Sequence, residues 1–269
     1  MPEANENRRF IFRGNAMPFG GRILQIGKRK VNEGVPGPAC AALPVVGGRV
    51  RATTRGASWG DAFKWGPTVA ESIGELRDDG SHVTTVTCSM ANFFAKNDPH
   101  VFEADQLRAT LVSTHPPTGE PAITAKELLF GSREKGMTLN GHRIELECED
   151  DLSLYPTFTD FKNGYRKKRD FFDLQQKTIS RTGEGKFGEA PPRAPNGYVT
   201  TSIVRRIHFR KKTIEGHVLY FKGFGSIYFG EVLMNENNRR FTMVRLEMGS
   251  SMRASMAAVE TDPNGIWSN

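Results

Sequence analysis

Two clusters of basic residues offer the clearest binding chemistry in this sequence. Residues 165–169 read Tyr-Arg-Lys-Lys-Arg with two phenylalanines close behind, and residues 205–212 hold five cations around Ile-His-Phe. Cations bind phosphate groups by neutralising their charge, and aromatic rings stack on bases. The sequence therefore predicts a candidate polyanion- or nucleic-acid-binding surface, formed by Arg166, Lys167, Lys168, Arg169, Arg206, His208 and Arg210.

The second of these clusters is expected to lie on a strand. Extended backbone places Arg206, His208 and Arg210 on one face, and it turns the apolar side chains to the other, namely Val199, Ile203, Ile207 and Phe209. Joint binding requires both clusters on one face of the molecule. The alternative is a solvated outer strand whose cations discourage pairing with another sheet edge. The signatures of RRM, KH and zinc-knuckle proteins are absent from the sequence.

The glycine-rich stretch GHVLYFKGFGSIYFGEV, residues 216–232, raises a second possibility, a phosphate-binding loop. Its spacing does not fit the dinucleotide fingerprint, and Glu231-Val232 stands where a P-loop needs Lys followed by Ser or Thr. We expect instead a turn at Gly223-Phe224-Gly225 and a bend or bulge at Gly230, with strands on both sides. The stretch resembles segments of uncharacterised bacterial β-rich proteins, which implies strands and brings no activity.

Catalytic motifs are missing from the sequence. The six histidines form no HxH or HExxH pair, no Gly-x-Ser-x-Gly elbow occurs, and no motif indicates a cofactor. Carboxylates and a histidine gather at Asp98, His100, Glu103 and Asp105, where a cation site could assemble, but we expect a solvated loop there. The acidic residues 145–151 are expected to form an exposed face. An enzyme site assembled in a barrel mouth from scattered histidines and carboxylates stays open.

Composition favours β structure without a membrane span. The chain has 269 residues, of which 28 are Gly and 18 are Phe, and short apolar runs alternate between turn signals. The net charge of +7 suits anionic partners, and three separated cysteines argue against a disulfide framework. Because the N-terminus has no apolar signal core and no run approaches 18 apolar residues, we expect a cytoplasmic protein.

These patterns predict an all-β, mainly antiparallel protein. Its core would be a β-sandwich or barrel, with a C-terminal four-strand meander at 198–210, 216–222, 226–234 and 239–248. At most one or two short helices are expected, one of them near 170–180, and residues 123–130 fit either helix or strand. Residues 142–149 alternate most cleanly, with Ile144, Leu146 and Cys148 on one face.

The expected organisation has four parts. Residues 1–40 form a loop-rich basic segment, residues 41–160 a β region, residues 161–197 a basic segment with a Gly/Pro-rich linker, and residues 198–269 the meander, whose last twenty residues look irregular. The two β regions may pack as one domain. The function that follows is a binding or structural β module for an anionic ligand or a partner protein, with the polyanion-binding and enzyme hypotheses as alternatives.

Overall fold

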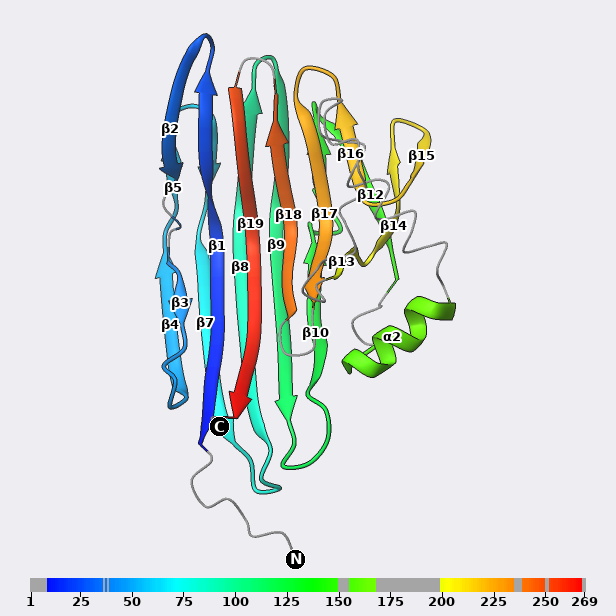
Figure 1. Cartoon of the computed structure of the whole chain (residues 1–269). Helices are drawn as coiled ribbons and strands as arrows, with labels where there is room; N and C mark the ends of the chain where they lie inside the picture. Colours follow the sequence, from blue (N-terminus) through cyan, green and yellow to red (C-terminus); the bar gives the residue numbers. More distant parts are fainter. Residues whose placement is uncertain are drawn as a thin grey trace, which may run out of the picture.

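The computed structural model describes residues 9–35, 37, 39–149, 155–167, 199–234, 239–249 and 252–267. Two antiparallel sheets pack face to face as a sandwich with long central strands (Figure 1). This arrangement confirms the all-β prediction. The described part contains one helix, α2 (Phe158–Lys167). Among the described residues, no helix has the length and apolar character needed to cross a membrane.

The first sheet has eight strands in the order β13-β17-β18-β19-β1-β2, with β16 on β17 and β3 on β1. Its strands are β1 (Phe10–Ile26), β2 (Arg29–Val35), β3 (Ala41–Ala42), β13 (Val199–Ser202), β16 (Val218–Phe221), β17 (Gly225–Met234), β18 (Arg239–Met248) and β19 (Met252–Trp267). The N-terminal β1 and the C-terminal β19 pair along almost their whole length.

The second sheet has eleven strands in the order β15-β14-β12-β11-β9-β8-β6-β5, with β10 on β9, β7 on β8 and β4 on β7. Its strands are β4 (Gly48–Thr54), β5 (Ala57–Trp59), β6 (Phe63–Trp65), β7 (Thr68–Leu76), β8 (His82–Asn97), β9 (His100–His115), β10 (Ala122–Phe130), β11 (Met137–Leu139), β12 (His142–Cys148), β14 (Val204–Phe209) and β15 (Lys212–Glu215).

A transverse seam crosses the first sheet at mid-height. Four strands skip one pairing position at the same level, and the residues in this row are Pro18, Val259, Met243 and Gly230. Val259 and Gly230 have positive φ values of 55° and 60°, which a β-branched residue such as Val259 rarely adopts. The residues that face the core change from even-numbered to odd-numbered positions, or the reverse, where a strand crosses this row. In β1, for example, Ala16 is buried before the row and Phe19 after it.

The second sheet has a matching seam. Strands β8 and β9 skip the pair Asn92–Asp105, and Asn92 has a φ of 50°. Buried positions change from even to odd in β8, from Met90 to Phe93. Because both neighbours shift phase together, the register between the strands is the same above and below the seam. We call these two rows together the seam.

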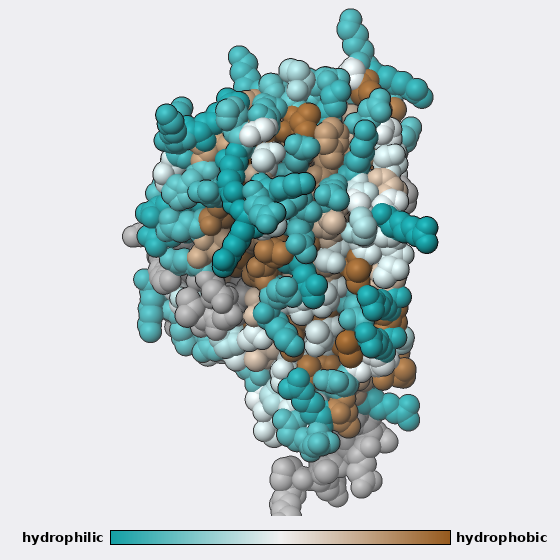
Figure 2. Space-filling model, turned by 180° about the vertical axis from the view of Figure 1, so that it is seen from behind, coloured by the Kyte–Doolittle hydropathy of each residue, from teal (hydrophilic) through white to brown (hydrophobic). Residues whose placement is uncertain are grey.

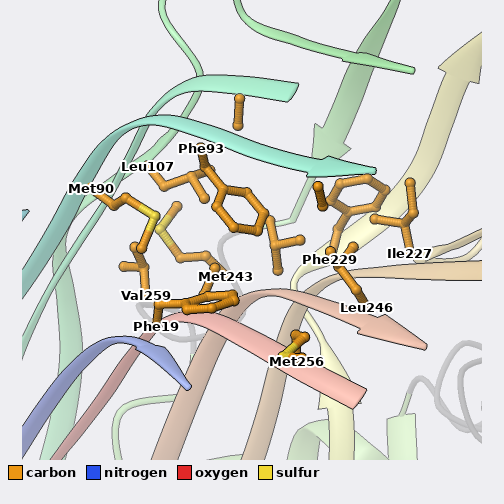
Figure 3. Close-up of a cluster of buried hydrophobic side chains, with 14 of the residues drawn as sticks. Phe19, Met90, Phe93, Leu107, Ile227, Phe229, Met243, Leu246, Met256 and Val259 are labelled. Atoms are coloured by element: carbon orange, nitrogen blue, oxygen red, sulfur yellow. The ribbon is translucent and has the colours of Figure 1, made fainter. Parts of the chain in front are cut away.

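The core lies between the sheets and is continuous across the seam. Figure 3 shows aromatic, aliphatic and methionine side chains from both sheets meeting there, including Phe19, Met90, Phe93, Phe229 and Val259. All five are almost fully buried. The flexible thioether of methionine fills irregular gaps of the kind that a change of strand phase leaves.

Several predicted elements were wrong. Residues 10–21 and 29–35, expected as loop, belong to β1 and β2, and the short strand considered at 22–26 is the end of β1. The last twenty residues, expected to be less regular, contain the whole of β19. The four-strand meander is confirmed, but it consists of β16 to β19. The predicted strand 198–210 divides at Ile203, because β13 pairs with β17 in the first sheet and β14 with β12 in the second. Residues 123–130 are strand.

Other expectations were met. Gly223 and Gly225 have φ values of 91° and 125° and connect β16 to β17, with no helix after them. An added Cβ at Gly230 would lie 2.7 Å from the Ile203 side chain, so glycine is required at this bend. Ile227 and Phe229 are fully buried and Phe221 is half-buried. The expected helix at 170–180 lies outside the described residues, and the division of the chain at residues 40, 160 and 197 stays a prediction.

Candidate anion-binding site

The candidate site begins at the turn between β14 and β15. Phe209 pairs with Lys212, so Arg210 and Lys211 alone form the turn, with φ values of 47° and 61°. Two positive φ values define a type I′ turn, which normally takes Asn-Gly. A non-glycine residue pays roughly 1–2 kcal/mol in this region. The hairpin tolerates that strain at two adjacent cations, and both side chains are exposed.

Aromatic rings hold the first of these cations. The Arg210 guanidinium carbon lies 5.3 Å from the ring centroid of Phe209 and 5.2 Å from that of Phe221. The two rings meet edge to face, with centroids 6.2 Å apart. Phe221 ends β16 of the first sheet, so cation–π contacts fix Arg210 where the two sheets meet.

A surface depression of about 340 Å³ opens beside this turn. Four cations line it, namely Arg143, Arg210, Lys211 and Lys212, together with His208, Thr213 and one carboxylate, Glu145. Arg143 lies 3.4 Å from Glu145 and also donates to the backbone oxygen of Arg133. With one carboxylate against four cations, the depression carries an excess positive charge that suits an anion.

The structure separates Arg206 from this depression. Its guanidinium lies 2.8 Å from Glu215 and 3.2 Å from Glu147, and the hydrogen bond and charge of Glu215, with Glu147, raise the pKa of Arg206. His208 lies 3.7 Å from Glu147. The predicted face is correct only in part: Arg206 and His208 lie opposite the buried Ile207 and Phe209, but Arg210 lies in the turn after β14, and Val199 belongs to β13 of the first sheet. The positive charge of this face is largely neutralised by carboxylates at Arg206. Cations outnumber carboxylates only near Arg210.

The other predicted cluster lies elsewhere. Arg166 and Lys167 end α2, and Lys168 and Arg169 lie outside the described residues. The first turn of α2 is bonded to Glu120, which follows β9, whereas the hairpin turn lies near His100 at the start of β9. Figure 1 shows α2 low beside the sandwich and the β14–β15 hairpin high. The first turn of α2 and the hairpin turn thus lie toward opposite ends of the long β9.

The basic cluster 205–212 already contained Arg210, Lys211 and Lys212, but sequence reasoning missed Arg143 as a member of the site. Arg143 was expected on the polar face of residues 142–149, and it is indeed exposed. Lys211, which lines the same depression, lies 68 residues after Arg143 in the sequence. No local pattern links these positions, because the β12–β14 pairing that joins them is a long-range contact.

Among the described residues, histidine and carboxylate side chains lie close at His208 with Glu147 and at His217 with Glu231. His217 lies 3.7 Å from Glu231 but is completely buried. Glu231 also binds Arg245 through both carboxylate oxygens, at 2.6 and 2.8 Å, and Tyr228 donates to Glu247. Burial alone raises the pKa of Glu231, yet the hydrogen bonds from Arg245 and the nearby His217 lower it to about 2. In this ion-pair network the histidine and its carboxylate partner, His217 and Glu231, are shielded from solvent.

A serine–histidine pair is also present. Ser113 Oγ and His115 Nε2 are 2.9 Å apart, and both residues are buried. Burial lowers the pKa of His115 to about 4, and its ring packs on Phe10. The pair sits in the packed end of the sandwich and does not form a nucleophile open to a substrate.

Carboxylates near the suspected cation site are engaged individually. Asp98 pairs with Lys96, and Asp105 accepts hydrogen bonds from the backbone and side chain of Ser132. His100 contacts Asn140 and Phe221. Within the described ranges, no group of three or more His, Cys, Asp or Glu residues is placed to hold a metal ion.

Residues 10–235 match a sequence family described as a domain of unknown function, DUF8256. The chain belongs to the DUF8256 family. No curated protein and no solved structure matches it. The DUF8256 match includes the β14–β15 hairpin but stops before β18 and β19, the two strands that join β17 to β1. The first sheet therefore depends on residues beyond the matched region.

Proposed function

We propose that this protein is a binding module whose β14–β15 hairpin recognises an anionic group. The observation that carries the proposal is the convergence of Arg143, Arg210, Lys211 and Lys212 on one depression with a single carboxylate. A planar carboxylate, sulfate or phosphate fits guanidinium donors, and two lysines add charge. The aromatic clamp on Arg210 supports the same role, since a pre-positioned cation loses less conformational freedom on binding.

The turn offers a variant that removes charge without loosening the fold. Arg210→Asn with Lys211→Gly deletes both cations and installs the residue pair that a type I′ turn prefers. We expect this double variant to unfold at the same temperature as the wild type or higher. Binding of pyrophosphate and of glucuronate, measured by calorimetry at low ionic strength, should fall at least tenfold. Added salt should weaken wild-type binding, because the site is exposed.

A second hairpin supplies the matched control. Lys28 and Arg29 lie at the turn between β1 and β2 and are exposed. Lys28→Ser with Arg29→Ser removes the same charge there and should leave binding unchanged. Equal losses in both double variants would show a general effect of net charge, and absence of binding by the wild type would refute the proposal.

A further inference from the structure

The depression at the hairpin continues across the outer face of the second sheet. A second depression of about 320 Å³ shares Arg143 and Glu145 with it, and a third of about 220 Å³ shares Gly136 with the second. Figure 2 shows this face from behind, where hydrophilic residues surround smaller apolar areas. The three depressions thus adjoin one another from the β14–β15 turn to the seam at Asn92 and Asp105, and the second also reaches the buried Ile144. We call this series of depressions the path.

Strand register places a row of outward side chains along this path. Arg143 pairs with Thr138, Thr138 with Glu103, Glu103 with Phe94, and Phe94 with Lys64. Each strand contributes one residue, from β12 through β11, β9 and β8 to β6. Four strand spacings of about 4.8 Å give the row a length of roughly 19 Å. The row therefore suits an extended chain lying across the strands.

Charge changes sign along the path. The first depression has four cations against Glu145, whereas the third has one cation, Lys135, against Glu103 and Asp105. Hydrogen bonds from Ser132 hold the pKa of Asp105 low, although its partial burial opposes them. A ligand with anions along its whole length would meet these two carboxylates in the third depression, before the row ends at Lys64. The complementary ligand is anionic at one end only.

The remaining groups of the path suit hydroxylated rings. Thr138 and Asn92 offer a hydroxyl and an amide, and Glu103 offers a carboxylate acceptor. Phe94 offers the part of its ring face that is left beside Lys64, whose Nζ lies 5.5 Å from the ring centroid. We infer that the ligand is a linear glycan with one acidic end, its anion on the hairpin and its neutral sugars along the row. This inference rests on the proposed function and adds the chemical class and orientation of the ligand.

The test compares three probes by calorimetry: glucuronate, a tetrasaccharide of neutral sugars ending in one glucuronate, and a heparin tetrasaccharide. The neutral-chain probe should bind the wild type at least tenfold more tightly than glucuronate. Phe94→Ala should remove most of that gain and leave the affinity for glucuronate unchanged. Glu103→Gln should weaken the neutral-chain probe and strengthen heparin binding. Tyr220→Ala changes an aromatic that is 64% exposed on β16, and it should have no effect.

The outcomes separate the two proposals. If no probe binds, the anion site itself is wrong. If glucuronate binds but the neutral chain adds nothing, or if Phe94→Ala behaves like Tyr220→Ala, the extended glycan site is wrong and the hairpin site survives. Tighter wild-type binding of heparin than of the neutral-chain probe would also overturn the inference, because it would show that Glu103 and Asp105 do not oppose a uniform polyanion.

Discussion

Two arginine networks in this protein have the same parts in different surroundings. Arg206 lies between Glu147 and Glu215, with His208 3.7 Å from Glu147. Arg245 lies between Glu231 and Glu247, with His217 3.7 Å from Glu231. The first is on the solvated face of β12, β14 and β15. The second is centred on the buried Glu231 of the first sheet and the buried His217, with Glu247 as exposed as Glu147, and the Arg245 guanidinium lies 3.6 Å from the Tyr228 ring centroid.

Burial decides what each network contributes. The side chain of Glu147 is 42% exposed, so water screens its attraction to Arg206. The side chain of Glu231 is 10% exposed and depends on Arg245 for compensation of its charge. The distances between the charged groups are similar in the two networks and do not distinguish them. The comparison teaches that only the buried one should be essential to the fold.

The largest expected effect is therefore that of Arg245→Ala. Removing the guanidinium leaves Glu231 buried beside a neutral gap, and breaking a buried pair in this way costs about 3–5 kcal/mol. Urea unfolding of the variant and the wild type measures this loss. A loss below about 1 kcal/mol would mean that the buried network behaves like the exposed one.

Acid should produce the next largest effect. The pKa of Glu231 is lowered to about 2 from an ordinary 4.5, so its carboxylate stabilises the fold fully above pH 4.5. That contribution is lost as pH falls from 4.5 toward 2, and it amounts to at most about 3 kcal/mol. Glu231→Gln should lack this part of the pH dependence of unfolding. An unchanged acid profile in the variant would assign the loss to other groups.

The smallest effect is expected for Arg206→Ala. The exposed pairs with Glu147 and Glu215 should contribute about 0–1 kcal/mol, and less at high salt. Urea unfolding at low and high salt measures both quantities. A salt-independent loss as large as that of Arg245→Ala would contradict the comparison.

Sequence predicted the parts of the fold that local pattern controls. The alternation around Ile144 correctly predicted β12, and the turn at Gly223 and Gly225 followed from the conformational freedom of glycine. The longest strands were only partly predicted. Residues 82–88 belong to β8 and residues 107–112 to β9, but alternation breaks at Asn92 and Asp105, so a periodic pattern stops at the seam.

Sequence predicted which strand face carries the candidate site, but it did not predict all of the residues that make up the site. Arg206 and His208 project from β14 as expected, whereas Arg210 lies in the turn that follows the strand. Nothing near Arg206 in the sequence shows that Glu147, 59 residues away, neutralises it. Likewise, the row from Arg143 to Lys64 exists only through the register of five strands, which no local pattern specifies.

The seam has a consequence for how this sequence can change in length. A strand that loses one residue normally turns every later side chain to the wrong face. Here Asn92 and Asp105 already shift phase together, so removing both would restore strict alternation in β8 and β9 while preserving their register. Deletion of either one alone would misalign the two strands. Insertions and deletions in relatives should therefore occur in matched pairs on neighbouring strands at this level of the sandwich.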